Sequence, residues 1–118
     1  MEKNVWVLRN STGSRLDEEA TMVRADTISY VRATVGSKIV VADLASQEVV
    51  TVVDEKDGLH HGQPRLPPRF HLDLMAKLTE ARVAALRQLD DEDRFVIAEV
   101  NDGKWAWVLY KLSELPQD

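Results

Sequence analysis

Residues 94–112 read RFVIAEVNDGKWAWVLYKL, two apolar runs on either side of Asp102-Gly103. An Asp-Gly pair between two such runs is the strongest short-range signal for a β-hairpin with a two-residue turn. That turn would set Ala98 opposite Trp107, with Trp105 on the same face. A hairpin in a small sheet usually exposes one face to water. Here we expect both faces to be covered, by the rest of the chain or by another subunit, because the opposite face also carries apolar side chains, namely Phe95, Ile97, Val108 and Tyr110.

The segment before this hairpin, residues 70–89, is predicted to form an amphipathic helix. Pro68 precedes it, where a missing N–H costs nothing in the first turn. Arg82 projects near the middle of the apolar stripe. Its stem could lie on apolar surface with the charge at the edge, or it could make an interfacial ion pair. The stripe expected to face the core is Leu74, Leu78, Ala81, Ala85 and Leu89, broadened by Met75 and Leu86.

The first half of the chain is predicted to form four or five short strands. The β-rich segments are Val5–Leu8, Met22–Asp26, Thr27–Arg32, Lys38–Leu44 and Glu48–Val53. Residues 54–68 hold two glycines and three prolines, which indicates an internal loop. Residues 1–118 are therefore expected to be one α+β domain. It would consist of an antiparallel β-meander that could roll into a partial barrel, one amphipathic helix and a C-terminal β-hairpin.

Composition limits the classes of function. At 118 residues, with 44% apolar and 30% charged residues, the chain can build one core. Its net charge of −5 disfavours binding to nucleic acid or to anionic membranes. The absence of cysteine excludes disulfides, zinc–thiolate sites and thiol nucleophiles, and it favours a cytoplasmic location. The longest apolar runs, such as Ile39–Ala42, are too short to span a bilayer, so we expect no membrane contact.

No motif in the chain points to catalysis. It has no Gly-x-Ser-x-Gly sequence, and its acidic residues occur in runs that normally face water. We therefore expect a protein that is not an enzyme, without cofactor or metal. One alternative is a small-ligand or metal-binding protein that uses the loop of residues 54–71. That loop contains His60, His61 and His71, although neighbouring histidines on a loop usually point apart.

The leading hypothesis is a small protein-interaction or regulatory module that binds a protein partner or a second copy of itself as a homodimer. The candidate contact residues are Trp105, Trp107, Tyr110 and Arg82. The sequence leaves open whether the tryptophans lie in an interface or in the core. A further alternative is a DNA-associated transcriptional regulator that uses the locally basic residues 64–89. These contain five cations and two acids, namely Arg65, Arg69, Lys77, Arg82 and Arg87 against Asp73 and Glu80.

Overall fold

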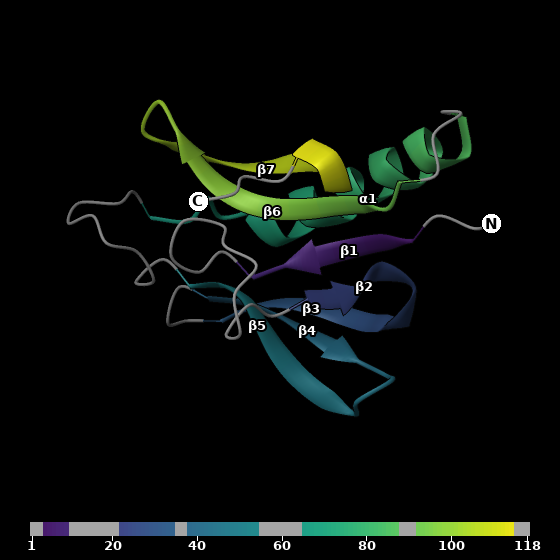
Figure 1. Cartoon of the computed structure of the whole chain (residues 1–118). Coiled ribbons are helices and arrows are strands. Elements are labelled where there is room, and N and C mark those ends of the chain that lie inside the picture. The colour runs from purple at the N-terminus through teal and green to yellow at the C-terminus, as the bar shows by residue number, and fades with distance from the viewer. Residues whose placement is uncertain (1–3, 10–21, 35–37, 55–64, 88–91, 115–118) are drawn as a thin grey trace.

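The strands and the helix occur in the predicted order. The computed structural model describes residues 4–9, 22–34, 38–54, 65–87 and 92–114. None of the helices in these ranges is long and apolar enough to cross a membrane. The elements (Figure 1) are β1 (Val5–Leu8), β2 (Met22–Arg24), the 3-10 turn η2 (Ala25–Thr27), β3 (Ile28–Thr34), β4 (Lys38–Asp43), β5 (Glu48–Asp54), α1 (Phe70–Arg87), β6 (Arg94–Asn101), β7 (Lys104–Lys111) and the 3-10 turn η3 (Leu112–Glu114).

A four-stranded sheet, sheet A, contains the predicted hairpin. Its strand order is β2-β1-β6-β7, and β6 and β7 pair antiparallel with Ala98 opposite Trp107. Asp102 and Gly103 have φ angles of 53° and 75°. A two-residue hairpin turn of this kind requires positive φ at both central residues, which Asp and Gly tolerate best. The predicted register and turn are therefore confirmed.

The pairing of β1 with β6 in sheet A is parallel, and local sequence did not predict it. Asp93, just before β6, accepts hydrogen bonds of 3.0 Å from the Asn4 backbone N–H and from Trp6 Nε1. The Arg94 backbone N–H donates to the Asn4 carbonyl at 2.9 Å. These contacts hold the start of β1 beside the start of β6. The strands of the first half are consequently divided between two sheets.

The second sheet, sheet B, is an antiparallel meander of β3, β4 and β5. The register shifts between Ile39 and Val40, so that β5 carries one extra residue at this point. Such a bulge changes the side of the sheet on which the following side chains lie. Val52 and Val53 are both fully buried as a result.

Asp43 organises the turn between β4 and β5. Its carboxylate accepts hydrogen bonds from the Thr27 hydroxyl (2.7 Å), the Ala45 backbone N–H (3.1 Å) and the Ser46 hydroxyl (3.0 Å). The Thr27 hydrogen bond is the largest cause of a pKa for Asp43 below its usual value of 3.8. The carboxylate therefore ties η2 to the turn as long as it is ionised.

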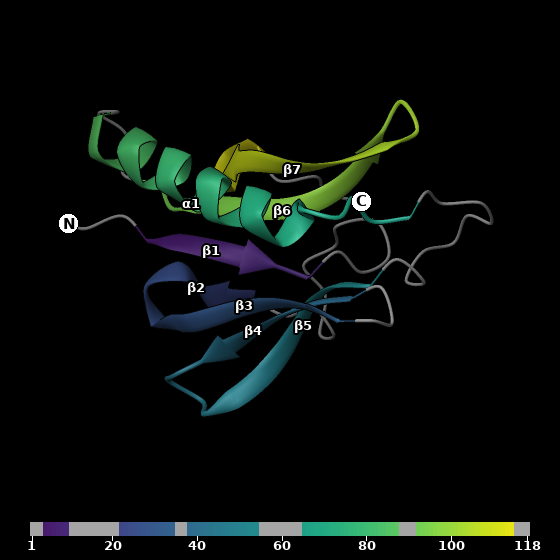
Figure 2. The same ribbon diagram turned by 180° about the vertical axis from the view of Figure 1, so that it is seen from behind.

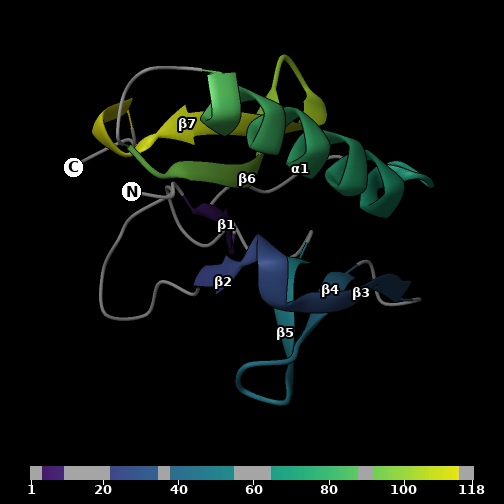
Figure 3. The same ribbon diagram turned by 90° about the vertical axis from the view of Figure 1, so that its right-hand side faces the viewer.

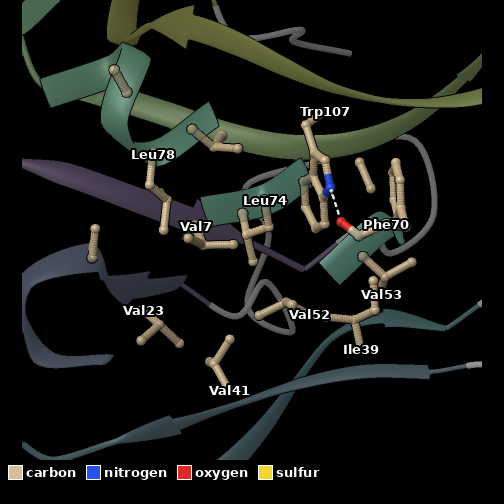
Figure 4. Packing of buried hydrophobic residues seen from close by; sticks show 14 of the residues in the cluster. Val7, Val23, Ile39, Val41, Val52, Val53, Phe70, Leu74, Leu78 and Trp107 are labelled. Carbon is tan, nitrogen blue, oxygen red and sulfur yellow. Dashed lines mark hydrogen bonds between the residues drawn. The ribbon is translucent and has the colours of Figure 1, made fainter. Parts of the chain in front are cut away.

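The core lies between α1, one face of sheet A and the inner face of sheet B. In Figure 2, α1 runs along β6 and β7, and in Figure 3 sheet B lies below the helix and below strands β1, β6 and β7 of sheet A. Figure 4 shows side chains from all three parts meeting in one cluster. The buried residues of this cluster are Val5, Val7, Val23, Ala25, Ile39, Val41, Val52, Val53, Phe70, Leu74, Leu78, Ala81, Val96, Ala98, Trp105 and Trp107.

The α+β architecture predicted from the sequence is confirmed, and the described strands do not close into a barrel. The helix begins at Phe70 as expected, and Leu89 lies outside the described residues. One part of the predicted stripe is wrong, because Met75 and Leu86 are exposed rather than buried. Both lie about 100° or more around the helix from the side that faces the core, which is centred near Leu74 and Ala81.

Candidate interaction surface

Trp105 and Trp107, two of the predicted contact residues, both lie in the core, with only 6% and 7% of their surface exposed. The Trp107 ring stacks on the Phe70 ring with the centroids 4.7 Å apart. Its Nε1–H donates a 2.9 Å hydrogen bond to the Phe70 carbonyl (Figure 4). Trp105 meets the same ring at 6.1 Å. The sequence left open whether the tryptophans lie in the core or in an interface. The structure places both in the core, so a partner cannot reach them in this conformation.

Tyr110, the third candidate, lies on the other face of sheet A. It packs with Trp6 against a small buried cluster of Leu8, Phe95 and Ile97. Its hydroxyl donates to the Glu99 carboxylate, whose oxygens lie at 2.8 and 2.9 Å. Burial raises the pKa of Tyr110 to about 12, and the hydrogen bond and negative charge of Glu99 add to this. On this second face of the hairpin, Phe95 and Ile97 are buried within the single chain, whereas Val108 and Tyr110 are half-buried.

Arg82, the fourth candidate, is exposed and reaches from α1 toward η2. Its Nη2 donates to the carbonyl of the buried residue Ala25 at 3.4 Å. The contact is to a backbone carbonyl rather than to a carboxylate. Among the described residues the arginine therefore makes no carboxylate ion pair within the chain, and its charge lies at the exposed edge of the helix.

A stripe of apolar side chains runs along the outer side of α1, away from the core. We call it the outer stripe, and its members are Leu72, Met75, Ala76, Thr79, Val83 and Leu86. Leu72, Met75, Val83 and Leu86 are 44%, 46%, 41% and 87% exposed. At 3.6 residues per turn the six positions fall within an arc of about 100°. The Thr79 hydroxyl donates to the Met75 carbonyl at 3.1 Å, so it needs no partner from outside the helix.

The sequence pattern contains this second stripe as well, although the prediction above assigns all the apolar residues of the helix to one broad side. The outer stripe recurs at intervals of three and four residues, as does the buried stripe that contains Leu74, Leu78 and Ala81. A helix with apolar residues on more than one side is normally buried more completely than a surface helix. In this structure only one of the two sides is covered by the chain itself.

Charged residues flank the outer stripe on both sides. Arg82 borders one side, and Asp73, Glu80 and Arg87 border the other, as the helical period places them. Lys77 pairs with Glu80 at 3.1 Å. A surface that follows a phosphate backbone keeps its cations together and free of acids. The mixed signs around α1 therefore do not favour the DNA-binding alternative for this segment.

The histidines predicted as possible ligands are not brought together by the described structure. His60 and His61 lie outside the described residues. His71 is the second residue of α1, and its buried Nδ1 has no hydrogen-bond partner among the described residues. Within the described ranges, no three His, Asp or Glu side chains gather so that they could hold a metal ion.

Other exposed apolar side chains belong to separate elements, and on none of these elements do four large ones align. They are Met22, Tyr30, Leu44, Val49 and Leu112. Tyr30 and Val49 flank Ala42 in the pairing of sheet B, so they form a second exposed apolar group, but among the described elements α1 carries the largest number of large exposed apolar side chains. Comparison of the chain with protein-family models, with curated proteins and with solved structures gives no match in any of the three.

Proposed function

We propose that this chain is a protein-interaction module that binds its partner through the outer stripe of α1. The observation that carries the proposal is the alignment of four large, exposed apolar side chains on one side of one helix. Single exposed leucines are ordinary on protein surfaces, whereas an aligned row is the pattern by which amphipathic helices bind a groove or another helix.

The packing of the inner side of α1 supports this role. Leu74, Leu78 and Ala81 are at most 1% exposed, so the helix is held firmly against both sheets. A rigid helix loses little conformational entropy when it binds. Covering the outer stripe would contribute on the order of 5 kcal/mol of apolar burial before the cost of association. That magnitude is adequate for a specific but reversible complex.

The experiment is site-specific photo-cross-linking in cells that express the protein. A photoreactive phenylalanine replaces Leu86, and the control carries it at Val49, which is also exposed but lies on sheet B. We expect a defined protein adduct at position 86 and none at position 49. Adding Met75→Glu to the same chain should suppress the adduct, because a charge in the stripe must lose its water when a partner binds. Equal labelling at positions 86 and 49 would overturn the proposal.

A further inference from the structure

We infer that the partner which covers the outer stripe is a second copy of this chain, with its α1 packed antiparallel across a two-fold axis at Thr79. The inference rests on the proposed function, since it names the occupant of the same surface. A two-fold interface must be complementary to itself, so that each residue meets its symmetry-related position. The outer stripe meets this requirement in its spacing and its shape, and the charged residues at the two ends of α1 are complementary in the same arrangement.

The spacing of the large side chains is symmetric about Thr79. Leu72 and Leu86 lie seven residues before and after it, and Met75 and Val83 lie four residues before and after it. At a rise of 1.5 Å per residue, these distances are about 10 Å and about 6 Å along the helix axis. An antiparallel pair would therefore set Leu72 against Leu86 of the second copy and Met75 against Val83 of the second copy. Each large apolar side chain would meet another at the same height.

The centre of the stripe permits a close approach of two helices. Ala76 and Thr79 are the smallest residues of the stripe, and both are exposed. The Thr79 hydroxyl is already bonded to the Met75 carbonyl at 3.1 Å, so covering it leaves no donor unsatisfied. Small residues at the crossing point bring helix axes toward the short end of the usual 8–10 Å separation.

The charges at the two ends of α1 favour the antiparallel direction. Asp73 lies in the first turn and Arg87 in the last, and both are exposed. Neither side chain forms an ion pair within the described residues. Antiparallel pairing would bring Asp73 beside Arg87 of the second copy at both ends of the interface. It would also oppose the helix dipoles, whereas parallel pairing would place like ends side by side.

The size of the stripe predicts a weak dimer. From Leu72 to Leu86 it extends over about 21 Å, and a helix with its side chains is about 10 Å wide. This footprint is well below the roughly 800 Å² per partner of a standard stable interface. We therefore expect a dissociation constant in the micromolar range, and monomers at low concentration.

Cysteine cross-linking tests the arrangement directly, because the chain contains no cysteine. Thr79→Cys places two thiols on the proposed axis, within the short distance that a disulfide requires. Leu72→Cys places them about 21 Å apart, too far to react, since each lies opposite position 86. Ser29→Cys is a nearly isosteric control at an exposed position on sheet B.

We expect Thr79→Cys to form a covalent dimer under mild oxidation, and Leu72→Cys to do so only when mixed with Leu86→Cys. Self-cross-linking of Leu72→Cys would overturn the antiparallel arrangement. Light scattering of the cysteine-free protein from about 5 to about 500 µM should show the mass rising toward that of a dimer. Leu86 is largely exposed, so Leu86→Glu should not disturb the fold. The mass of this variant should stay that of a monomer over the same concentration range.

The outcome separates this inference from the proposed function. If Thr79→Cys cross-links no faster than Ser29→Cys and the mass stays monomeric, the second copy is not the partner. In that case a photo-adduct at position 86 whose mass differs from two chains would leave the proposed function standing. If both experiments fail, both proposals are wrong.

Discussion

Replacing Trp107 by alanine should destabilise the monomer rather than weaken a complex. Its indole is buried, stacks on Phe70 at 4.7 Å and donates a 2.9 Å hydrogen bond to the Phe70 carbonyl. Removal of a buried tryptophan or phenylalanine side chain typically costs about 3–5 kcal/mol, which includes the cavity left behind. A domain of this length has a total stability of about 6–18 kcal/mol, so the loss is a large share of it.

Urea unfolding followed by far-ultraviolet circular dichroism is the suitable assay, because the substitution removes a fluorescent probe. With a urea dependence of about 1.5 kcal/mol per molar, a loss of 3–5 kcal/mol lowers the midpoint by about 2–3 M. Trp107→Phe is the matched control. It keeps a ring to stack on Phe70 but loses the hydrogen bond, and it should cost about 1–2 kcal/mol.

A different pattern would refute this reasoning. If Trp107→Ala lowered the unfolding free energy by less than about 1 kcal/mol while it reduced the dimer mass at high concentration, the ring would belong to an interface. The sequence by itself allowed that result, because a tryptophan on a hairpin suits a core and a contact surface equally well. Its burial against Phe70 is the reason for expecting the opposite.

Three further predictions concern the two sides of α1, Tyr110 and Asp43. Leu78→Ala should cost about 2–5 kcal/mol and Leu86→Ala less than about 0.5 kcal/mol in urea unfolding at low concentration, and equal costs would contradict the assigned sides of the helix. The folded-state pKa of Tyr110 is raised from 10.0 to about 12, so its stabilising contribution is complete below pH 10 and is lost as the pH rises toward 12. Absorbance titration should therefore show late tyrosinate formation that Tyr110→Phe removes, and a late phase that persists in this variant would rule out the assignment. The pKa of Asp43 is lowered below 3.8, so its contribution is present above that pH and is lost as the pH falls through the lowered value. Asp43→Asn should speed amide hydrogen exchange at Leu44, whose N–H bonds the Thr27 carbonyl at 2.8 Å, and unchanged exchange would show that the carboxylate does not hold the turn.

Much of the secondary structure could be read from local chemistry. Asp102-Gly103 is a short-range turn signal because these two residues tolerate positive φ, and the register of β6 and β7 then follows from counting outward. The start of α1 at Phe70 followed from the helical period and from the prolines before it. These features depend on neighbours a few residues apart, which is why a single sequence taken by itself was enough to predict them.

The candidate site could be predicted only in part. Arg82 stood out because its charge interrupts the apolar stripe, and by the helical period it lies beside the outer stripe. The outer stripe itself was missed, since Met75 and Leu86 fit either side of an apolar helix when the packing is unknown. The tryptophans were placed among the contact residues because residue type alone does not reveal what covers a side chain.

The sequence by itself determined the α+β class, the order of the elements, and a hairpin with apolar residues on both faces. Only the tertiary structure decided that β1 runs parallel to β6, a contact between segments almost ninety residues apart that Asp93 holds through Asn4 and Trp6. The tertiary structure also decided which side of α1 packs on sheet A and which side faces solvent. Turn chemistry and helical period are local properties, whereas strand pairing and burial depend on a free energy summed over the whole core. No short stretch of the chain determines that free energy by itself.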